Sequence, residues 1–146
     1  MCGITGYWKA GRLEPAAEMN LKNMAKSLHH RGPDGYGFHF NEEIGLAMGH
    51  ARLSIIDLDT GSQPLYSQNK KNVLTVNGEF YDYKRIRTNL RLEGFEFDTK
   101  SDSEIALPLY RKHGLDFVDH LRGEFAISMY DEEKDRLILV RDRFGV

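Results

Sequence analysis

The 146-residue chain contains a single cysteine, at position 2. One cysteine cannot form an intramolecular disulfide, and it cannot supply the CxxC ligand pairs of a structural zinc site. The fold must therefore rest on a hydrophobic core, and a chain of this length buries roughly two-thirds of its unfolded surface. The composition agrees, since 40% of the residues are hydrophobic and 29% are charged, as in ordinary globular domains.

Charge and hydropathy exclude several classes of protein. Twenty Lys and Arg residues stand against twenty-two Asp and Glu residues, for a net charge of −2, so the chain lacks the basic surface of nucleic-acid-binding domains. No segment approaches the roughly 20 apolar residues of a membrane span. The N-terminus has neither the basic nor the apolar region of a signal peptide. We therefore expect a cytoplasmic protein with no nucleic-acid and no membrane partner.

The six histidines give no sign of a metal site. None has an acidic or cysteine partner at the spacing of metal ligands. A glycine-rich phosphate loop of the Walker type is also absent from the sequence. The sequence therefore predicts no metal and no cofactor in this chain.

The hydrophobic pattern predicts more strand than helix. Apolar residues at i, i+3, i+4 and i+7 predict a helix at 21–28, and three further helices are predicted between 82 and 94, between 101 and 114, and at 116–121. Strands are predicted at 4–8, 38–40, 44–54, 73–76, 125–130 and 136–140. Because the turns between them are short, these strands favour antiparallel pairing, and the expected class is α+β.

Three local signals describe the helices in more detail. Asp82 can cap the helix that follows it. Ser101 and Glu104 match a capping box, because they stand three residues apart before an apolar run. Pro108 falls inside the next helix and is expected to kink it, since proline lacks the N–H that bonds back one turn.

The last residues have the pattern of an interrupted domain. A strand of the buried type at 137–140 is followed by Arg-Asp-Arg-Phe-Gly-Val, which is typical of a turn into another element. We therefore expect residues 1–146 to be one domain that is truncated at its C-terminus.

Cys2 stands between the initiator methionine and Gly3, which leads into an apolar strand. Its small side chain favours removal of Met1, which would leave a thiol and a free α-amine on one residue. An α-amine has a pKa near ~8, so it can act as the base that activates the thiol. The alternative at this position is an incidental cysteine, either exposed or in the core.

Seven short motifs run in order along the whole chain. They are Met-Cys-Gly-Ile at 1–4, Arg-Gly-Pro-Asp-Gly at 31–35, Gly-His-Ala-Arg-Leu-Ser-Ile-Ile-Asp at 49–57, Gln-Pro-Leu at 63–65, Asn-Gly-Glu at 77–79, Ser-Asp-Ser-Glu at 101–104 and Arg-Asp-Arg-Phe-Gly at 141–145. Together they resemble class II glutamine amidotransferases, and most closely the glutaminase domain of glutamine-hydrolysing asparagine synthetases.

The resemblance implies an N-terminal-nucleophile hydrolase fold, which is a four-layer αββα sandwich of two mainly antiparallel sheets. It implies that Cys2 attacks the side-chain amide of glutamine, forms a thioester and releases ammonia before water frees glutamate. In relatives a second, synthetase domain, which this chain lacks, uses ATP and Mg²⁺ to make asparagine from aspartate and that ammonia. Glutamine and such a synthetase domain are therefore the expected partners, and a homodimer is left open.

The resemblance also implies that Asn77 and Gly78 supply the oxyanion donors. Asn77 would use its side-chain amide and Gly78 its backbone N–H, and losing one such donor typically costs about 10²–10³ in rate. From the residues alone, the alternative is a plain turn after a strand, because Asn-Gly is the strongest short hairpin signal.

Three charged residues could grip the α-groups of an amino acid. Arg52 can hold a carboxylate through paired hydrogen bonds, and a surface arginine at a strand edge is the alternative. Asp102 can pair with the ammonium, although an acid in the first turn of a helix also suits the macrodipole. Glu79 adds negative charge nearby or is simply solvated. In relatives the backbone of four residues lines the same pocket, here Leu53, Ser54, Ile55 and Ile56.

Two other functions stay open from the sequence. The same type of glutaminase supplies other amide-forming synthetases, and only the missing domain would identify the ammonia acceptor. The chain could also be a non-catalytic or truncated remnant of such a domain, although a remnant has no reason to keep Cys2, Arg52, Asn77 and Asp102 together.

Overall fold

The computed structural model describes residues 2–57 and 60–145. The described residues contain seven strands in two sheets, with the orders β1-β3-β2 in sheet A and β4-β5-β6-β7 in sheet B, and every pair is antiparallel. Sheet A consists of β1 (Gly3–Trp8), β2 (Gly35–Asn41) and β3 (Leu46–Arg52). Sheet B consists of β4 (Leu65–Tyr66), β5 (Asn72–Phe80), β6 (Gly123–Asp131) and β7 (Arg136–Arg141).

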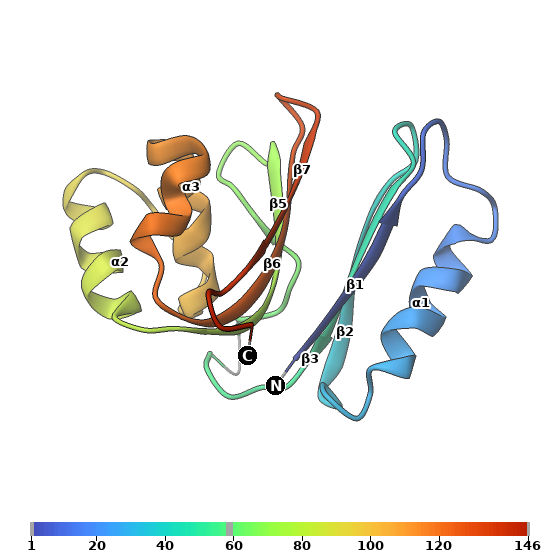
Figure 1. The fold of residues 1–146 in the computed structure, drawn as a ribbon, viewed down its shortest axis with the longest axis horizontal. Coiled ribbons are helices and arrows are strands. Elements are labelled where there is room, and N and C mark those ends of the chain that lie inside the picture. The colour runs from blue at the N-terminus through green and yellow to red at the C-terminus, as the bar shows by residue number, and fades with distance from the viewer. Residues whose placement is uncertain (1, 58–59, 146) are drawn as a thin grey trace.

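Helices cover the outer face of each sheet. Figure 1 shows the two sheets face to face, with α1 outside sheet A and α2 and α3 outside sheet B. Their bounds are Ala17–Ser27 for α1, Tyr83–Leu92 for α2 and Ala106–His113 for α3, with 3-10 helices at Asp102–Ile105 (η1) and Gly114–His120 (η2). The layers are therefore α, β, β and α, which confirms the predicted α+β sandwich. None of these helices is long and apolar enough to cross a membrane.

The alternation of side chains along β3 decides what faces the site. Leu46 and Met48 pack between the sheets against Val73 and Tyr130 of sheet B. The opposite face of β3 lies against α1, because a side chain at Gly49 would meet Leu21. Since side chains alternate along a strand, the two polar residues that follow at even positions on β3, His50 and Arg52, also point between the sheets.

The same alternation orients β5. Val73 faces sheet A, so Asn77 and Glu79 share that face. Val76 and Phe80 point the other way and pack beneath the helices in the core of sheet B. The polar residues of β3 and β5 therefore meet at one end of the seam between the two sheets.

The strands differ in two places from their predicted bounds. β5 continues through Asn77 and Gly78 to Phe80, so this dipeptide lies inside a strand and the turn alternative is wrong. β2 begins at Gly35, three residues before the strand predicted at 38–40. In both places glycine is a strand residue, and at Gly78 it allows the close approach of another backbone.

Two predicted helix caps are also wrong in detail. Asp82 precedes α2 in the left-handed conformation, with φ of 59°, and makes no side-chain cap bond. Ser101 Oγ accepts from the N–H of Ser103 at 3.3 Å, but Glu104 does not complete a capping box and instead accepts from the N–H groups of Asp98 and Thr99. The sequence spacing identifies the start of the segment, but it does not choose between these partners.

Pro108 is the third residue of α3, and α3 begins directly after η1. The N–H groups of the first turn of a helix have no partner within the helix. A proline at this position therefore costs no hydrogen bond of α3. The expected kink inside the helix is replaced by a change from 3-10 to α geometry just before it.

Candidate active site

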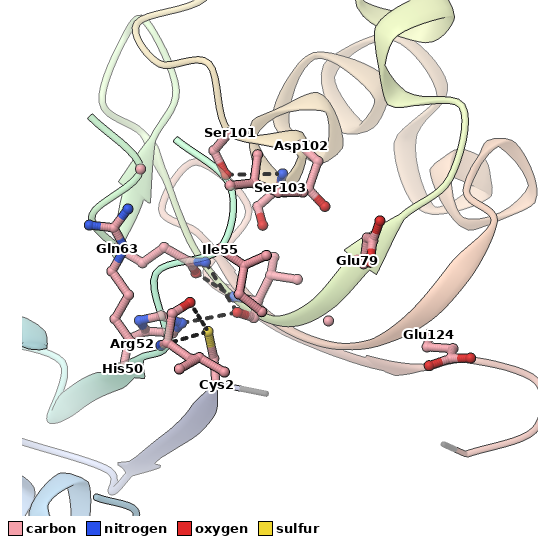
Figure 2. Close-up of a pocket in the computed structure, with 15 residues that line it drawn as sticks. Cys2, His50, Arg52, Ile55, Gln63, Glu79, Ser101, Asp102, Ser103 and Glu124 are labelled. Atoms are coloured by element: carbon pink, nitrogen blue, oxygen red, sulfur yellow. Dashed lines mark hydrogen bonds between the residues drawn. The ribbon is translucent and has the colours of Figure 1, made fainter. Parts of the chain in front are cut away.

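A cavity of about 160 Å³ lies at the polar end of the seam between the sheets (Figure 2). It is smaller than the roughly 300–1,000 Å³ of pockets for drug-sized ligands, so its size suits an occupant such as one amino acid. The residues that line it are Cys2, His50, Arg52, Leu53, Ile55, Ile56, Gly61, Gln63, Val76, Gly78, Glu79, Ser101, Asp102, Ser103 and Glu124. Eight of the ten predicted site residues are among them, and Ser54 and Asn77 are not.

Cys2 is held at the start of β1, where the ladder to β3 begins. Gly3 pairs with Ala51, so the residue before it lies beside the end of β3. The Cys2 Sγ atom accepts a hydrogen bond from the N–H of Leu53 at 3.3 Å. Nε of Arg31 donates to the Cys2 carbonyl oxygen at 3.1 Å. Cys2 is therefore held through both its thiol and its backbone carbonyl, and it lines the cavity.

The Arg31–Gly35 segment, to which the sequence assigns no chemistry, supports the nucleophile. Besides the bond from Arg31, Gly32 lies so close to β3 that a Cβ there would be 2.3 Å from the carbonyl oxygen of Ala51. Asp34 accepts from the N–H of Ser54 at 2.6 Å. The segment thus fixes both Cys2 and the loop after β3, and Ser54 acts as an anchor of that loop.

Gly78 offers a backbone donor to the cavity. Its pairing partner Phe125 gives both of its backbone groups to Asp142, since Phe125 N–H donates to the carboxylate and Phe125 C=O accepts from Asp142 N–H. In an antiparallel ladder, non-hydrogen-bonded pairs point their backbone groups away from each other. The N–H of Gly78 therefore points away from β6, toward the cavity side of β5.

Only glycine fits at position 78. Its φ is +148°, and a Cβ would lie 2.0 Å from the carbonyl oxygen of Glu124. Asn77 lies on the face of β5 that points toward sheet A, and its Oδ1 is buried without a hydrogen-bond partner in the described parts of the chain. Its side chain does not line the cavity, so the oxyanion role of Asn77 stays a prediction.

Arg52 marks the cationic end of the cavity. Its guanidinium donates to the carbonyl oxygen of Asp57 and, at 3.5 Å, to Ser62 Oγ. A Cβ at Gly61 would be 3.0 Å from Nη2 of Arg52, so this glycine leaves the guanidinium its room. The loop that follows β3 therefore folds back and holds the guanidinium of Arg52, the last residue of β3.

Asp57 joins this loop to the opposite wall. Its carboxylate accepts from the N–H and the hydroxyl of Thr60 and, at 2.8 Å, from the N–H of Lys100. Burial raises the pKa of Asp57, but these hydrogen bonds outweigh burial and leave the pKa below its ordinary value. The ionised carboxylate therefore ties the loop of Arg52 to the segment that leads into Asp102.

The anionic end consists of Asp102, Glu79 and Glu124, which Figure 2 shows across the cavity from Arg52. Asp102 is 5% exposed, and its Oδ2 accepts from the N–H of Phe80 at 2.8 Å. Burial raises the pKa of Asp102, and the nearby Glu79 charge raises it further. A cation between these carboxylates would relieve that repulsion, so this end favours an ammonium group.

Seven lining residues were not predicted as site residues: His50, Gly61, Gln63, Val76, Ser101, Ser103 and Glu124. His50 is 1% exposed, and its Nε2 donates to the carbonyl oxygen of Val76 at 3.1 Å. Burial lowers the pKa of His50 to about 4. The sequence could have indicated His50, because it lies two residues before Arg52 in the same predicted strand and therefore points to the same face. The other six depend on contacts between distant segments.

Within residues 2–57 and 60–145, no group of three or more His, Cys, Asp and Glu side chains is placed to hold a metal ion.

The fold confirms the predicted four-layer αββα sandwich. It matches the solved glutamine phosphoribosylpyrophosphate amidotransferase of Bacillus subtilis with a TM-score of 0.77 and 22% sequence identity, over 99% of this chain and 38% of that one. The chain belongs to the glutamine amidotransferase domain family, whose model matches residues 1–146.

Curated relatives match this chain over its whole length. Asparagine synthetase B [glutamine-hydrolyzing] of Escherichia coli is 40% identical over 148 residues, and the chain covers 26% of that protein. Asparagine synthetase [glutamine-hydrolyzing] 2 of B. subtilis is 39% identical, with 19% of it covered. Amidase chry2 of Gibberella zeae is 41% identical over 156 residues, with 23% covered. The chain therefore spans about a quarter or less of these relatives.

Proposed function

We propose that the chain hydrolyses the side-chain amide of glutamine through a thioester on Cys2. One observation carries the proposal: the Cys2 thiol and the backbone edge at Gly78 face the same cavity, whose ends carry opposite charges. Glutamine carries the complementary groups: an α-carboxylate for the cation, an α-ammonium for the carboxylates, and a side-chain amide for the thiol. Membership of the glutamine amidotransferase domain family supports the same chemistry.

The charged residues would orient the substrate. Arg52 would bind the α-carboxylate, and charge-assisted bonds of this kind are roughly twice as strong as neutral ones. Asp102 and Glu79 would bind the α-ammonium. The side-chain amide would then lie between Cys2 and Gly78.

The reaction would begin once Met1 has been removed. The α-amine of Cys2 takes the thiol proton, and the thiolate attacks the amide carbon. The oxyanion that forms accepts from the N–H of Gly78 and, in the resemblance-based assignment, from the side chain of Asn77. Collapse of this intermediate breaks the C–N bond, the departing nitrogen takes the proton, and ammonia leaves. Water then cleaves the thioester to glutamate and regenerates the thiol.

The ammonia would serve a synthetase domain. The named asparagine synthetases support asparagine formation from aspartate as the most direct assignment. In that assignment ATP and Mg²⁺ act in the synthetase domain, and the full reaction takes place in the cytoplasm. The chain itself performs only the glutaminase half.

A second acceptor is favoured by one finding. The amidase from G. zeae is as similar to this chain as the synthetases are. The glutaminase half-reaction is the same for any acceptor, so the same site would supply ammonia to a different amide-forming enzyme.

The proposal is tested with 6-diazo-5-oxo-L-norleucine, a glutamine-like electrophile, and an intact mass measurement. We expect one adduct on a chain that begins at Cys2, and we expect excess glutamine to block it. Glutamate release from glutamine should be lost in Cys2→Ala. A correctly processed chain that forms no adduct and releases no glutamate would contradict the proposal and leave the remnant alternative.

A further inference from the structure

Two side chains converge on the backbone of one residue beside the cavity. Nε2 of His50 and Nε2 of Gln63 both donate to the carbonyl oxygen of Val76 at 3.1 Å. The N–H of Val76 donates to Oε1 of Gln63 at 2.6 Å. Gln63 therefore binds the Val76 peptide edge in the way that a neighbouring strand would, and His50 adds a second donor.

These bonds lie on the same edge of β5 as Gly78. Backbone groups at alternate residues of an antiparallel strand point to the same side. Along this edge Leu74 pairs with β4, Val76 binds Gln63 and His50, and Phe80 binds Asp102. Gly78 lies between two of these anchored positions, so its N–H is aimed by the residues on both sides of it.

The anchor at Val76 also spans the two sheets. Cys2 belongs to sheet A through the ladder between β1 and β3, and His50 is on β3 of that same sheet. Gly78 belongs to sheet B. The hydrogen bond from His50 therefore joins β3, which pairs with the strand that follows Cys2, to β5, which carries Gly78. The bond is made at Val76, the residue before Asn77.

His50 has the properties that such a bond needs. A carbonyl oxygen can only accept, so Nε2 must carry the proton. Its Nδ1 is buried with no hydrogen-bond partner among the described residues, and Gln63 is 9% exposed. A buried polar group that breaks its bond pays the full desolvation cost, which makes each bond to Val76 hard to break.

We propose that His50 and Gln63 are positioning residues of the glutaminase reaction, which together fix the distance between the Cys2 thiol and the oxyanion donors of β5. They do not touch the reacting atoms. They hold the Val76 peptide so that the N–H of Gly78 is in place when the oxyanion forms. This inference rests on the proposed glutaminase function, and it assigns to both residues an effect on the chemical step rather than on substrate affinity.

The test uses Gln63→Met, which keeps the length of the side chain and removes its hydrogen bonds. Steady-state glutamine hydrolysis is measured together with the rate at which iodoacetamide alkylates Cys2, since alkylation forms no oxyanion. We expect kcat to fall by about 10²-fold, the cost of a small misplacement of a reacting group, while KM and the alkylation rate stay within about threefold of wild type. Gln68→Met is the matched control, because Gln68 is an exposed glutamine that does not line the cavity and whose side chain donates to Asp98 at 3.3 Å.

A pair of variants at His50 separates positioning from folding. His50→Leu removes the donor, whereas His50→Gln places an N–H₂ group at a similar reach. We expect the leucine variant to lose kcat and the glutamine variant to recover most of it, at similar melting temperatures. Unchanged kcat in Gln63→Met, a rise of KM alone, or a parallel loss of alkylation would each overturn the inference. Wild-type protein that hydrolyses no glutamine would instead refute the proposed function, so the two failures are distinguishable.

Discussion

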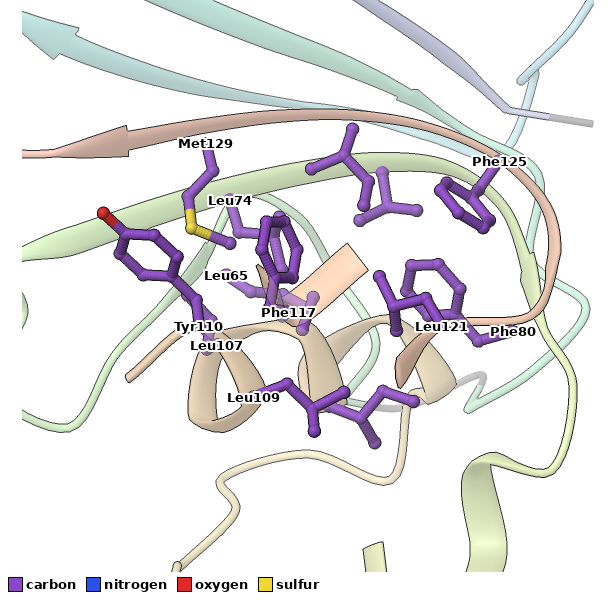
Figure 3. Packing of buried hydrophobic residues seen from close by; sticks show 14 of the residues in the cluster. Leu65, Leu74, Phe80, Leu107, Leu109, Tyr110, Phe117, Leu121, Phe125 and Met129 are labelled. Atoms are coloured by element: carbon purple, nitrogen blue, oxygen red, sulfur yellow. The ribbon is translucent and has the colours of Figure 1, made fainter. Parts of the chain in front are cut away.

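The two sheets contribute unequally to stability and to the site. Sheet B and its helices enclose a cluster of sixteen buried residues (Figure 3), whereas the cluster between the sheets has four. Figure 3 shows aromatic and aliphatic side chains packed between the strands of sheet B and α3. Sheet A instead lies close to α1 through small residues such as Gly49. Sheet B is therefore the stable base, and the chemistry is assembled at the seam.

This division has a physical reason. A reactive thiol and an unsatisfied N–H cannot be packed inside a dry core, because buried polar groups without partners are costly. At the end of the seam, each sheet contributes one reactive group and the loops close around them. The comparison predicts that changes at the seam alter activity more than stability, and that changes inside the large core do the reverse.

The largest expected effect is at the nucleophile. Cys2→Ala should lower glutamine hydrolysis by about 10⁴-fold or more, as removal of a catalytic nucleophile does elsewhere. Its melting temperature should stay near that of wild type, because Cys2 is only half-buried and precedes the first strand. Residual hydrolysis near the wild-type rate would mean that the reaction does not use this thiol.

The converse experiment removes a side chain from the large core. Phe117 is 0% exposed and stacks edge-on with Tyr110. Phe117→Ala should cost about 3–5 kcal/mol of stability in denaturant unfolding. At a temperature where the variant remains folded, its KM for glutamine should match wild type. A large change in KM would show that the core and the site are not separable.

The buried histidine at the seam predicts a pH dependence. The pKa of His50 is lowered by burial to about 4, whereas an unfolded histidine titrates near 6.5. Between these values the unfolded chain binds the proton and the folded chain does not, so stability falls as pH falls. The loss grows from about pH 6.5 to about pH 4 and reaches about 3 kcal/mol.

Comparison with His50→Gln isolates this contribution from the other titrating groups. We expect the difference in unfolding free energy between wild type and variant to change across that pH range and to be constant above it. A difference that does not vary with pH would mean that folding does not shift the pKa of His50.

The site could be predicted from sequence only as far as its residues lie in short motifs. Cys2, Arg52, Gly78 and Asp102 were assigned in this way, and the structure brings all four around one cavity. The Val76 anchor could not be predicted, because it depends on which edge of β5 remains without a neighbouring strand. That edge is decided by the pairing of distant segments, and no local pattern encodes it.

The fold shows the same limit. The strands of sheet A and the αββα layers follow from hydrophobic alternation and from the family resemblance. β4 was missed because it has two residues, Leu65 and Tyr66, which is too short to show a period. The strands predicted at 38–40 and 73–76 stopped short of Gly35 and Gly78 for another reason, because glycine is also common in turns. Each is a strand residue. Position 78 requires glycine because a Cβ there would clash with a carbonyl oxygen of β6.

A smaller effect is expected at the cationic end of the seam. Arg52→Gln should raise KM for glutamine by about 10- to 100-fold, since a hydrogen bond to a charged group contributes about 1.5–3 kcal/mol. The same variant should hardly change the hydrolysis of 4-aminobutanamide, which is glutamine without its α-carboxylate. Equal losses with both compounds would show that Arg52 acts through the loop that it holds rather than through the carboxylate.

The smallest effect concerns a residue between β5 and α2 that lies outside the site. Asp82 has φ of 59° and makes no cap bond to α2. Asn tolerates the left-handed conformation and Ser does not, whereas both are good N-caps. Asp82→Ser should therefore cost about 1 kcal/mol of stability, Asp82→Asn should cost much less, and both should hydrolyse glutamine like wild type. Equal stability of the two variants in denaturant unfolding would favour a capping role, and a change in KM would contradict the separation of the stable base from the seam.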